Sequence, residues 1–167
     1  MGSTSDSDTI VLFTTGGTMD KVYFDQPGDY AVGPPMIRDI LANGRVESGI
    51  EIRELLRKDS QEMNDHDRQA IRHAVATCGA DRIVITHGTD TMPLTAAALE
   101  GLIGKTIVLT GAFVPARFSN SDTPFNVGMA VAAARTLAPG VYIAMNGSVV
   151  PGTSVRKDRE RLRFVPV

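Results

Sequence analysis

Cysteine, net charge and long apolar runs are all scarce in this chain of 167 residues. Its one cysteine, Cys78, excludes an intramolecular disulfide, and without a second cysteine or clustered histidines it argues against a structural zinc site. A net charge of −2 and a pI near 5.9 give nucleic acid or an anionic membrane no basic surface to bind. We therefore predict no metal, no nucleic-acid partner and no membrane partner.

The first eight residues are polar and acidic, and no apolar run approaches the length of a membrane span. A secretory signal peptide would instead place a basic stretch before an apolar one. We expect residues 1–8 to form a disordered tail, and the single cysteine favours a reducing, cytoplasmic setting. With 43% hydrophobic and 22% charged residues, the remainder, 9–167, fits one globular domain with a substantial core.

Strand-like and helix-length segments alternate along that domain. Five apolar segments suit strands: Thr9–Thr14, Ile50–Leu55, Arg82–Thr86, Thr106–Thr110 and Val141–Met145. Helices are predicted between them, at about Pro35–Ala42, Asp65–Cys78 with Asp65 as N-cap, Thr91–Ile103, and from Asp122 or Thr123 through Ala134. The alternation predicts an α/β fold with a doubly wound, mainly parallel sheet flanked by helices, Rossmann-like or flavodoxin-like, in a single domain.

One segment, Lys21–Pro35, shows no clear period and is rich in proline and glycine. Long irregular loops in compact domains are usually functional lids or loose linkers. Because this one directly follows the first motif described below, we favour a lid; a merely loose connection is the alternative.

Two threonine-containing turns follow predicted strands. Thr15-Gly-Gly-Thr-Met19 comes after the first strand, and His87-Gly-Thr-Asp-Thr-Met92 comes after the third. In an open α/β sheet, ligands bind outside the carboxyl ends of the strands, so the two turns point to one hydroxyl-rich pocket.

A threonine hydroxyl needs a base to take its proton, and an amide needs its oxygen polarised, before one attacks the other. Thr18 follows the turn Gly16-Gly17, whose N–H groups can serve a developing oxyanion, although the motif could simply end a strand. Asp90 lies at a helix start, where it also suits an N-cap. Lys157 is a candidate to act on such a hydroxyl, but its alternating charged neighbours equally suit a solvated edge strand. These alternatives stay open.

The two motifs in this order resemble the L-asparaginase/glutaminase family of amidohydrolases, which use a threonine nucleophile. Asp29-Tyr-Ala-Val-Gly33, Asp59-Ser-Gln-Glu-Met-Asn64, Gly111-Ala112 with Pro115, and Gly152–Lys157 are similar to further family segments. The resemblance implies five catalytic residues: Thr18 as nucleophile, Tyr30, Thr89, Asp90 and Lys157. It implies substrate-binding roles for Gly17, Ser60, Gln61, Gly88 and Ala112. His87, by contrast, is interpreted as a satisfied core histidine.

The implied function is hydrolysis of L-asparagine to L-aspartate and ammonia through an acyl-threonine intermediate, with a weaker glutaminase activity and no cofactor. Two alternatives remain open: the ammonia-releasing domain of a tRNA-dependent amidotransferase, and a non-catalytic α/β domain that binds a nucleotide or phosphate. Gly16-Gly17 lacks the Gly-x-Gly-x-x-Gly spacing of a dinucleotide site.

Typical family members carry a second domain that places an acidic residue near the substrate amino group of a neighbouring subunit, and this chain stops near where its linker would begin. We therefore expect a more open pocket. We also expect a homodimer or homotetramer, because leaving Leu162 and Phe164 of the apolar tail exposed would forfeit roughly 1.5 to 3 kcal/mol each. Light scattering at micromolar protein checks this, and an active monomer would contradict it.

Overall fold

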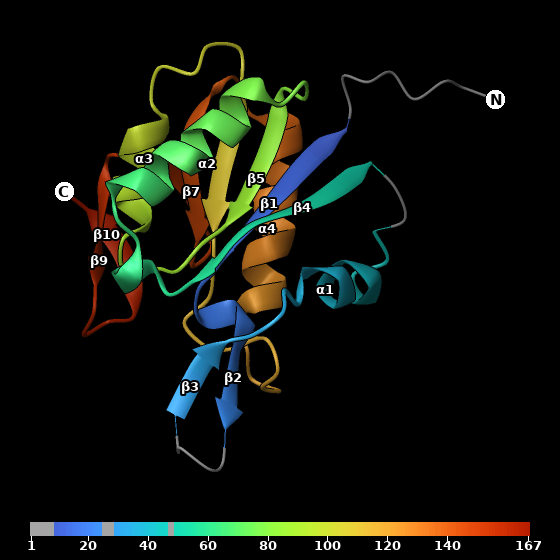
Figure 1. Ribbon diagram of the computed structural model, residues 1–167, viewed down its shortest axis with the longest axis vertical. Coiled ribbons are helices and arrows are strands. Elements are labelled where there is room, and N and C mark those ends of the chain that lie inside the picture. Colours follow the sequence, from blue (N-terminus) through green and yellow to red (C-terminus); the bar gives the residue numbers. More distant parts are fainter. Residues whose placement is uncertain (1–8, 25–28, 47–48) are drawn as a thin grey trace.

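The computed structural model describes residues 9–24, 29–46 and 49–167; the predicted tail 1–8 lies outside them. A six-stranded sheet in the order β4-β1-β5-β6-β7-β8 runs through the centre of the domain (Figure 1). Neighbouring strands are parallel except β7 and β8. The strands are β1 (Ile10–Gly16), β4 (Ile50–Lys58), β5 (Arg82–Thr86), β6 (Thr106–Thr110), β7 (Gly140–Met145) and β8 (Ser148–Pro151).

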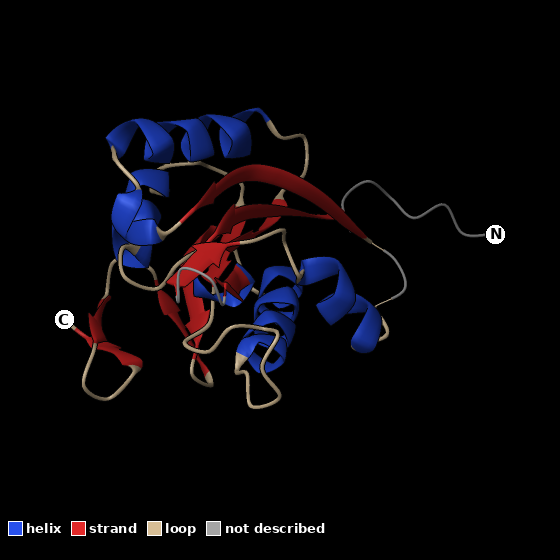
Figure 2. Cartoon of the chain, turned by 60° about the horizontal axis from the view of Figure 1, so that its bottom comes forward, coloured by secondary structure: helices blue, strands red, loops and turns tan. Residues whose placement is uncertain are grey.

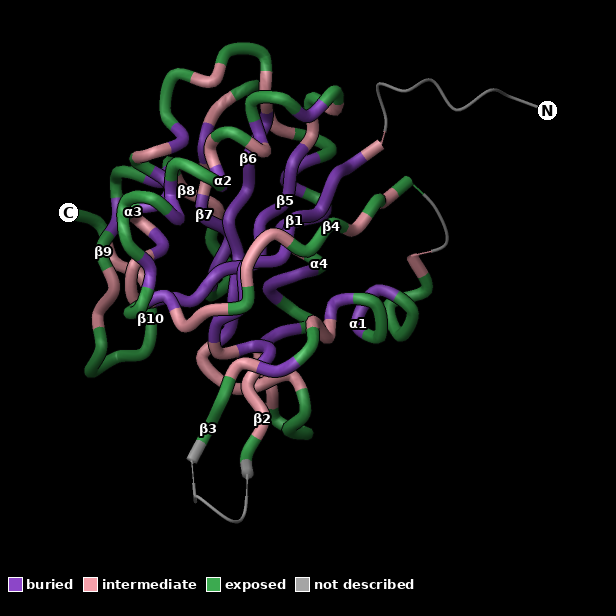
Figure 3. Tube along the Cα trace, viewed as in Figure 1, coloured by how far each residue is buried: buried purple, intermediate pink, exposed green. Residues whose placement is uncertain are grey.

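Helices cover both faces of this sheet (Figure 2). Successive side chains of a strand point to opposite faces, so Val11 and Phe13 join one core cluster while Ile10 and Leu12 join the other. The first cluster packs under α2 and α3, and the second under α1 and α4. The central strands are accordingly buried on both sides (Figure 3). These helices are α1 (Ile37–Asn43), α2 (Asp65–Thr77), α3 (Met92–Leu99) and α4 (Thr123–Thr136).

The predicted doubly wound, mainly parallel α/β fold is confirmed. Counting only the parallel strands along the chain, their order is 2-1-3-4-5, the flavodoxin-like arrangement. In such a sheet the chain changes direction between the first and third of these strands, here β1 and β5, which makes their carboxyl ends the expected ligand site.

Two of the helix boundaries that differ from prediction have a clear local cause. The N-cap of α2 is Asn64 rather than Asp65, because Asn64 and Asp67 exchange hydrogen bonds with each other's backbone in a capping box. Helix α3 ends at Leu99, before the predicted Ile103, because Glu100 with a ψ of 147° and Gly101 with a φ of 80° form a turn that does not continue a helix.

The prediction that Lys21–Pro35 is irregular is wrong for most of its described residues. Strands β2 (Lys21–Phe24) and β3 (Asp29–Val32) pair in antiparallel fashion, with Lys21 opposite Val32, and project from the sheet as the β2–β3 hairpin (Figure 1). Residues 25–28 lie outside the described residues. Pro27 and Gly28, which obscured the period, fall between two short runs that each suit a strand.

The C-terminal segment forms a second hairpin. Strand β9 (Val155–Asp158) pairs with β10 (Arg163–Pro166). Phe164 packs against the core and against Phe113, at 6.5 Å between ring centroids, whereas Leu162 remains 57% exposed. The chain therefore partly buries one of the two tail side chains and leaves the other exposed, and the expected homo-oligomer stays a prediction. Within the described part of the chain, no helix combines the length and apolar character needed to cross a bilayer.

Asp20 anchors the base of the β2–β3 hairpin. Its backbone oxygen accepts from Gly33 N–H at 2.8 Å, and its Oδ1 accepts from Met36 N–H at 2.9 Å. The residue is 1% exposed, and its Oδ2 has no hydrogen-bond partner among the described residues. Burial raises the pKa of this carboxyl to about 6, against the lowering effect of the Met36 bond.

We expect Asp20→Asn to gain stability relative to wild type as the pH rises. Between pH values near 4 and 6 the folded chain keeps a proton on Asp20 that the unfolded chain releases, so wild type loses up to about 3 kcal/mol from this group. Asparagine does not titrate and still offers an oxygen to Met36. Urea unfolding at about pH 4.5 and 7.5 measures the difference between the two proteins, and the same difference at both pH values would contradict the expectation.

Candidate active site

The two threonine motifs meet backbone to backbone at the carboxyl ends of β1 and β5. Gly17 has a φ of 96° and donates its N–H to Lys58 O at 3.0 Å. A Cβ added to Gly17 would lie 2.4 Å from Gly88 N, so only glycine allows this approach. The contact sets Thr18 beside the loop that carries Thr89 and Asp90.

The two threonines of the first motif have different surroundings. Thr15 is buried and donates its hydroxyl to Thr86 O at 2.8 Å, which ties β1 to β5. Thr18 is only half-buried and begins a short 3-10 helix, Thr18–Asp20. Of the two hydroxyls, that of Thr18 is therefore the one open to a ligand.

Lys157 reaches the second motif from β9. Its Nζ lies 2.7 Å from Thr89 Oγ1 and 3.0 Å from Asp90 Oδ1, and it sits 5.3 Å from the centroid of the Phe113 ring. Gln61 Nε2 donates to the other Asp90 oxygen at 3.1 Å. Burial raises the pKa of Asp90, but the bonds from Gln61 and Lys157 outweigh it and leave that pKa below its ordinary value. Asp90 is thus held as a carboxylate.

The candidate substrate-binding turn, the 3-10 helix Ser60–Glu62, packs against the second motif. Ser60 is 0% exposed, and its carbonyl accepts from the Thr91 hydroxyl at 2.8 Å. A Cβ on Gly88 would lie 2.5 Å from Ser60 Oγ. That hydroxyl has no hydrogen-bond partner within the described residues. A buried, unsatisfied hydroxyl facing the site is suited to bind a polar group of a ligand.

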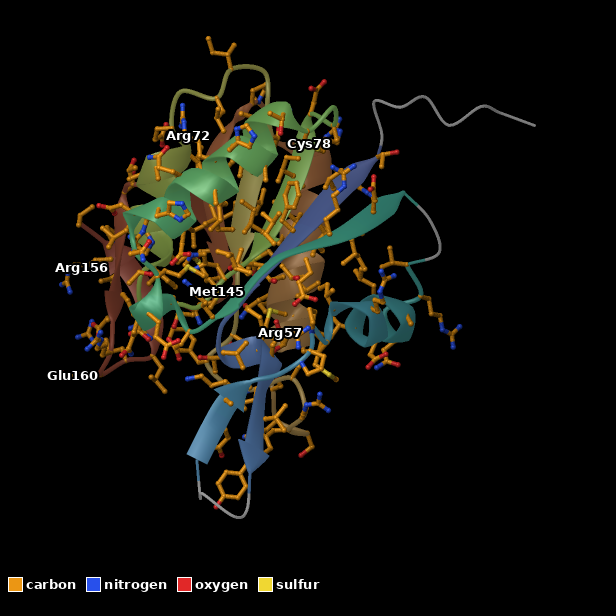
Figure 4. The ribbon with its side chains drawn as sticks, in the orientation of Figure 1. Arg57, Arg72, Cys78, Met145, Arg156 and Glu160 are labelled. Atoms are coloured by element: carbon orange, nitrogen blue, oxygen red, sulfur yellow. The ribbon has the colours of Figure 1, made fainter. Side chains whose placement is uncertain are left out.

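Tyr30 lies on the β2–β3 hairpin and lines a pocket next to Gln61. It is 46% exposed and packs on Tyr23 with ring centroids 5.2 Å apart. It shares with Gln61 a pocket of about 450 Å³ between the hairpin and the end of β4, where Figure 4 labels Arg57. The pocket is lined by Lys21, Tyr30, Ala31, Val32, Arg57, Asp59, Gln61 and Glu62. Thr18 is not one of these lining residues, so a contact between Tyr30 and the nucleophile candidate stays a prediction.

His87 is the satisfied core histidine that was predicted. Its Nδ1 lies 2.7 Å from Gly88 O, and its Nε2 lies 2.8 Å from Thr95 Oγ1. Because a carbonyl oxygen only accepts, Nδ1 carries the proton and Nε2 accepts from the threonine. Burial lowers the pKa of the imidazole to about 4, despite the bond to Gly88. His87 therefore stays neutral and supports the loop.

Ala112 is 1% exposed, and the neighbouring Gly111 packs against the carbonyl of His87. Of the candidate substrate-binding residues, Gly88 thus contacts both Gly17 and Ser60, and Ala112 adjoins them through the His87 loop. The described residues contain no group of three or more histidine, cysteine, aspartate or glutamate side chains arranged to hold a metal ion.

Sequence reasoning missed two cations at the site. Arg159 Nη2 lies 3.1 Å from Asp90 Oδ1, and Lys21 Nζ lies 2.7 Å from Asp59 Oδ2. The alternating charges of 156–163 were visible in the sequence, but only the path of the β9–β10 hairpin decides which of them faces Asp90.

Comparisons with known proteins identify the family of this chain. The family model described as "Asparaginase, N-terminal" matches residues 9–162. The L-asparaginase of Thermococcus kodakarensis is 37% identical over 155 residues, which cover 89% of this chain and 47% of that protein. Its solved structure matches with a TM-score of 0.81 at 34% identity and covers 95% of this chain and 51% of that one.

A second kind of relative matches a shorter region. A glutamyl-tRNA(Gln) amidotransferase subunit of Methanococcus vannielii is 42% identical over 83 residues, 48% of this chain and 19% of that protein. The chain spans about half the length of the asparaginases it matches. With a match that runs from β1 to the β9–β10 hairpin and includes both threonine motifs, the chain belongs to the asparaginase family, in the part that corresponds to its N-terminal domain.

Proposed function

We propose that this chain hydrolyses the side-chain amide of L-asparagine to L-aspartate and ammonia, with a weaker activity on L-glutamine. The observation that carries the proposal is the contact of Lys157 with Thr89 and Asp90, next to the loop that holds Thr18. A hydroxyl nucleophile needs a proton-handling group within reach, and this cluster is of that kind.

In the proposed reaction the Thr18 Oγ attacks the amide carbon with help from Tyr30, and its proton passes to the Thr89, Asp90 and Lys157 group. We place the tetrahedral oxyanion against the backbone that follows Gly17 and the region of Ala112, where N–H groups can stabilise it. The Gly17 N–H, which the sequence suggested as a donor, is instead bonded to Lys58 O. Collapse breaks the carbon–nitrogen bond and releases ammonia, which takes up the proton. Water then attacks the threonine ester, forms aspartate and restores the Thr18 hydroxyl. No cofactor takes part.

The substrate-binding turn supplies the remaining contacts. We assign the α-carboxylate to the buried Ser60 hydroxyl and its neighbours Gly17 and Gly88, and the amino group to the surroundings of Gln61 and Asp90. The unsatisfied Ser60 oxygen supports this assignment, since a bound carboxylate would provide its missing partner.

One other function is favoured by a specific observation. The match to an amidotransferase subunit suggests release of ammonia for a partner enzyme that acts on tRNA. That function would require tRNA and a second protein for turnover, whereas an independent asparaginase releases ammonia alone. The phosphate-binding alternative is disfavoured, because Gly17 N–H is already bonded to Lys58 O.

Replacing Thr18 with alanine should abolish turnover, by at least about a thousandfold, while the fold stays intact. Thr18→Ser keeps a hydroxyl and is the matched control, for which we expect residual activity. Ammonia release from asparagine measures both, and urea unfolding checks the fold. Hydroxylamine should intercept the ester in wild type as aspartyl hydroxamate. If the Thr18→Ala variant keeps an activity within a few-fold of wild type, Thr18 is not the nucleophile.

Asp90→Asn and Lys157→Met should each remove most activity, and the double variant should be scarcely worse than either single one. Residues that act as a unit show this strong non-additivity, because the second loss finds nothing left to remove. Steady-state kinetics of wild type and the three variants measures the coupling. If the two losses multiply independently, Lys157 is only a strand residue that happens to touch Asp90.

A further inference from the structure

The chain has four lysines, and the structure gives each a partner. Lys157 contacts Asp90, and Lys58 contacts Asp67 at 2.9 Å. Lys105 donates to two backbone carbonyls of the segment that follows α2. Lys21 is the one that lines the pocket beside Tyr30 and Gln61. The reaction proposed above gives it no part.

Lys21 joins the β2–β3 hairpin to the substrate-binding turn. It begins β2, and its N–H donates to Thr18 O, so its backbone is fixed at the base of the hairpin. Its Nζ lies 2.7 Å from Asp59 Oδ2, and both side chains are 26% exposed. Asp59 is the N-cap of the turn, and its Oδ1 accepts from Gln61 N–H at 3.1 Å. One carboxylate therefore holds Lys21 and the Gln61 backbone together.

The same contacts continue to the proton-handling group. Gln61 binds Asp90 through its side chain, and Asp90 binds Lys157. Two carboxylates thus lie on either side of Gln61. Burial raises the pKa of Asp59 and the charge of Asp90 adds to this effect, but the bonds from Lys21 and Gln61 outweigh both and leave that pKa below its ordinary value. Lys21 supplies the cation that compensates the charge of Asp59.

Small movements of this turn would reach the site directly. Ser60 is fully buried between the Gly88 backbone and the Thr91 hydroxyl, with no space for a shift toward Gly88. A solvent-accessible ion pair near the surface contributes little to global stability, and the Lys21–Asp59 pair is partly exposed, so the effect of Lys21 should be local. Close-packed substrate contacts are sensitive to displacements of an ångström or less.

We propose that Lys21 is a positioning residue of this amide-hydrolysis site: through Asp59 it fixes the turn that carries Ser60 and Gln61 to the β2–β3 hairpin. This inference rests on the proposed function for its kinetic part only. Without Lys21, Asp59 is an uncompensated carboxylate beside Asp90, and it also repels the carboxylate of an amino-acid substrate.

The test compares Lys21→Met, Lys21→Arg, Asp59→Asn and the double variant K21M/D59N. For K21M we expect the KM for asparagine to rise about tenfold, with kcat within about threefold of wild type, because binding geometry is lost rather than chemistry. K21R restores the ion pair and should restore KM. In K21M/D59N the uncompensated charge at position 59 is gone, and the oxygen of the substituted amide side chain can still accept from Gln61 N–H. We therefore expect KM to return most of the way to the wild-type value.

Lys58→Met is the matched control. Lys58 is also a lysine and immediately precedes Asp59, but its ion-pair partner is Asp67. Asp67 is 8% exposed and belongs to the capping box of α2. We expect K58M to lower the urea midpoint with little change in KM, and K21M to raise KM with little change in the midpoint. A merely structural role for Lys21 predicts that its two readouts move together.

Two measurements without turnover keep the inference separate from the proposed function. Hydrogen exchange at the Gln61 amide should be faster in K21M than in wild type, and a ¹³C titration should show a higher pKa for Asp59. If wild type releases no ammonia from asparagine, the proposed function fails, and these two readouts still decide the role of Lys21. Unchanged exchange and titration in K21M, or a double variant as impaired as K21M, would overturn it.

Discussion

The close approach of Gly17 to Gly88 is the constraint on which the rest of the site depends. Parallel strands β1 and β5 end side by side. A Cβ on Gly17 would meet the Gly88 backbone, and a Cβ on Gly88 would meet Ser60, so neither position has room for a side chain. As a result, the loops after two buried strands carry Thr18 and Thr89 to the same edge of the sheet.

Charge pairing is the second organising feature. Asp59 has Lys21, and Asp90 has Lys157 and Arg159, so these two carboxylates are matched by cations from different hairpins. The β2–β3 and β9–β10 hairpins are peripheral to the sheet, and each holds the site through an ion pair. A rigid sheet thus supplies the nucleophile candidate and its neighbour motif, while two surface hairpins supply the lysines.

Features that obey local rules could be predicted from the sequence. Apolar runs such as Arg82–Thr86 are buried on both faces and have the composition of central strands, and their alternation with helices indicated a parallel sheet. The two motifs converge because strand ends do so in this fold class. The strand prediction missed Asn146-Gly147, a strong hairpin signal with both residues at positive φ, which joins β7 to β8.

Long-range side-chain pairing could not be predicted in this way. Lys21 and Asp59 are far apart in sequence, and nothing local to either identifies the other. Lys157 was left between two interpretations because its own strand is a charged hairpin strand; the structure shows that it is such a strand and that its ammonium still reaches Thr89 and Asp90. Tyr30 shows the reverse case, since its segment matches a family pattern while its ring packs on Tyr23.

The buried carboxyl of Asp20 has a consequence for how the protein handles protons. In mild acid the folded chain carries a proton on Asp20 and none on His87, because burial raises the first pKa to about 6 and lowers the second to about 4. The unfolded chain has the opposite preference, with an ionised aspartate and a protonated histidine. Unfolding in that range therefore transfers one proton from a residue beside the first motif to a residue in the second, and the two sites together take almost none from the solvent.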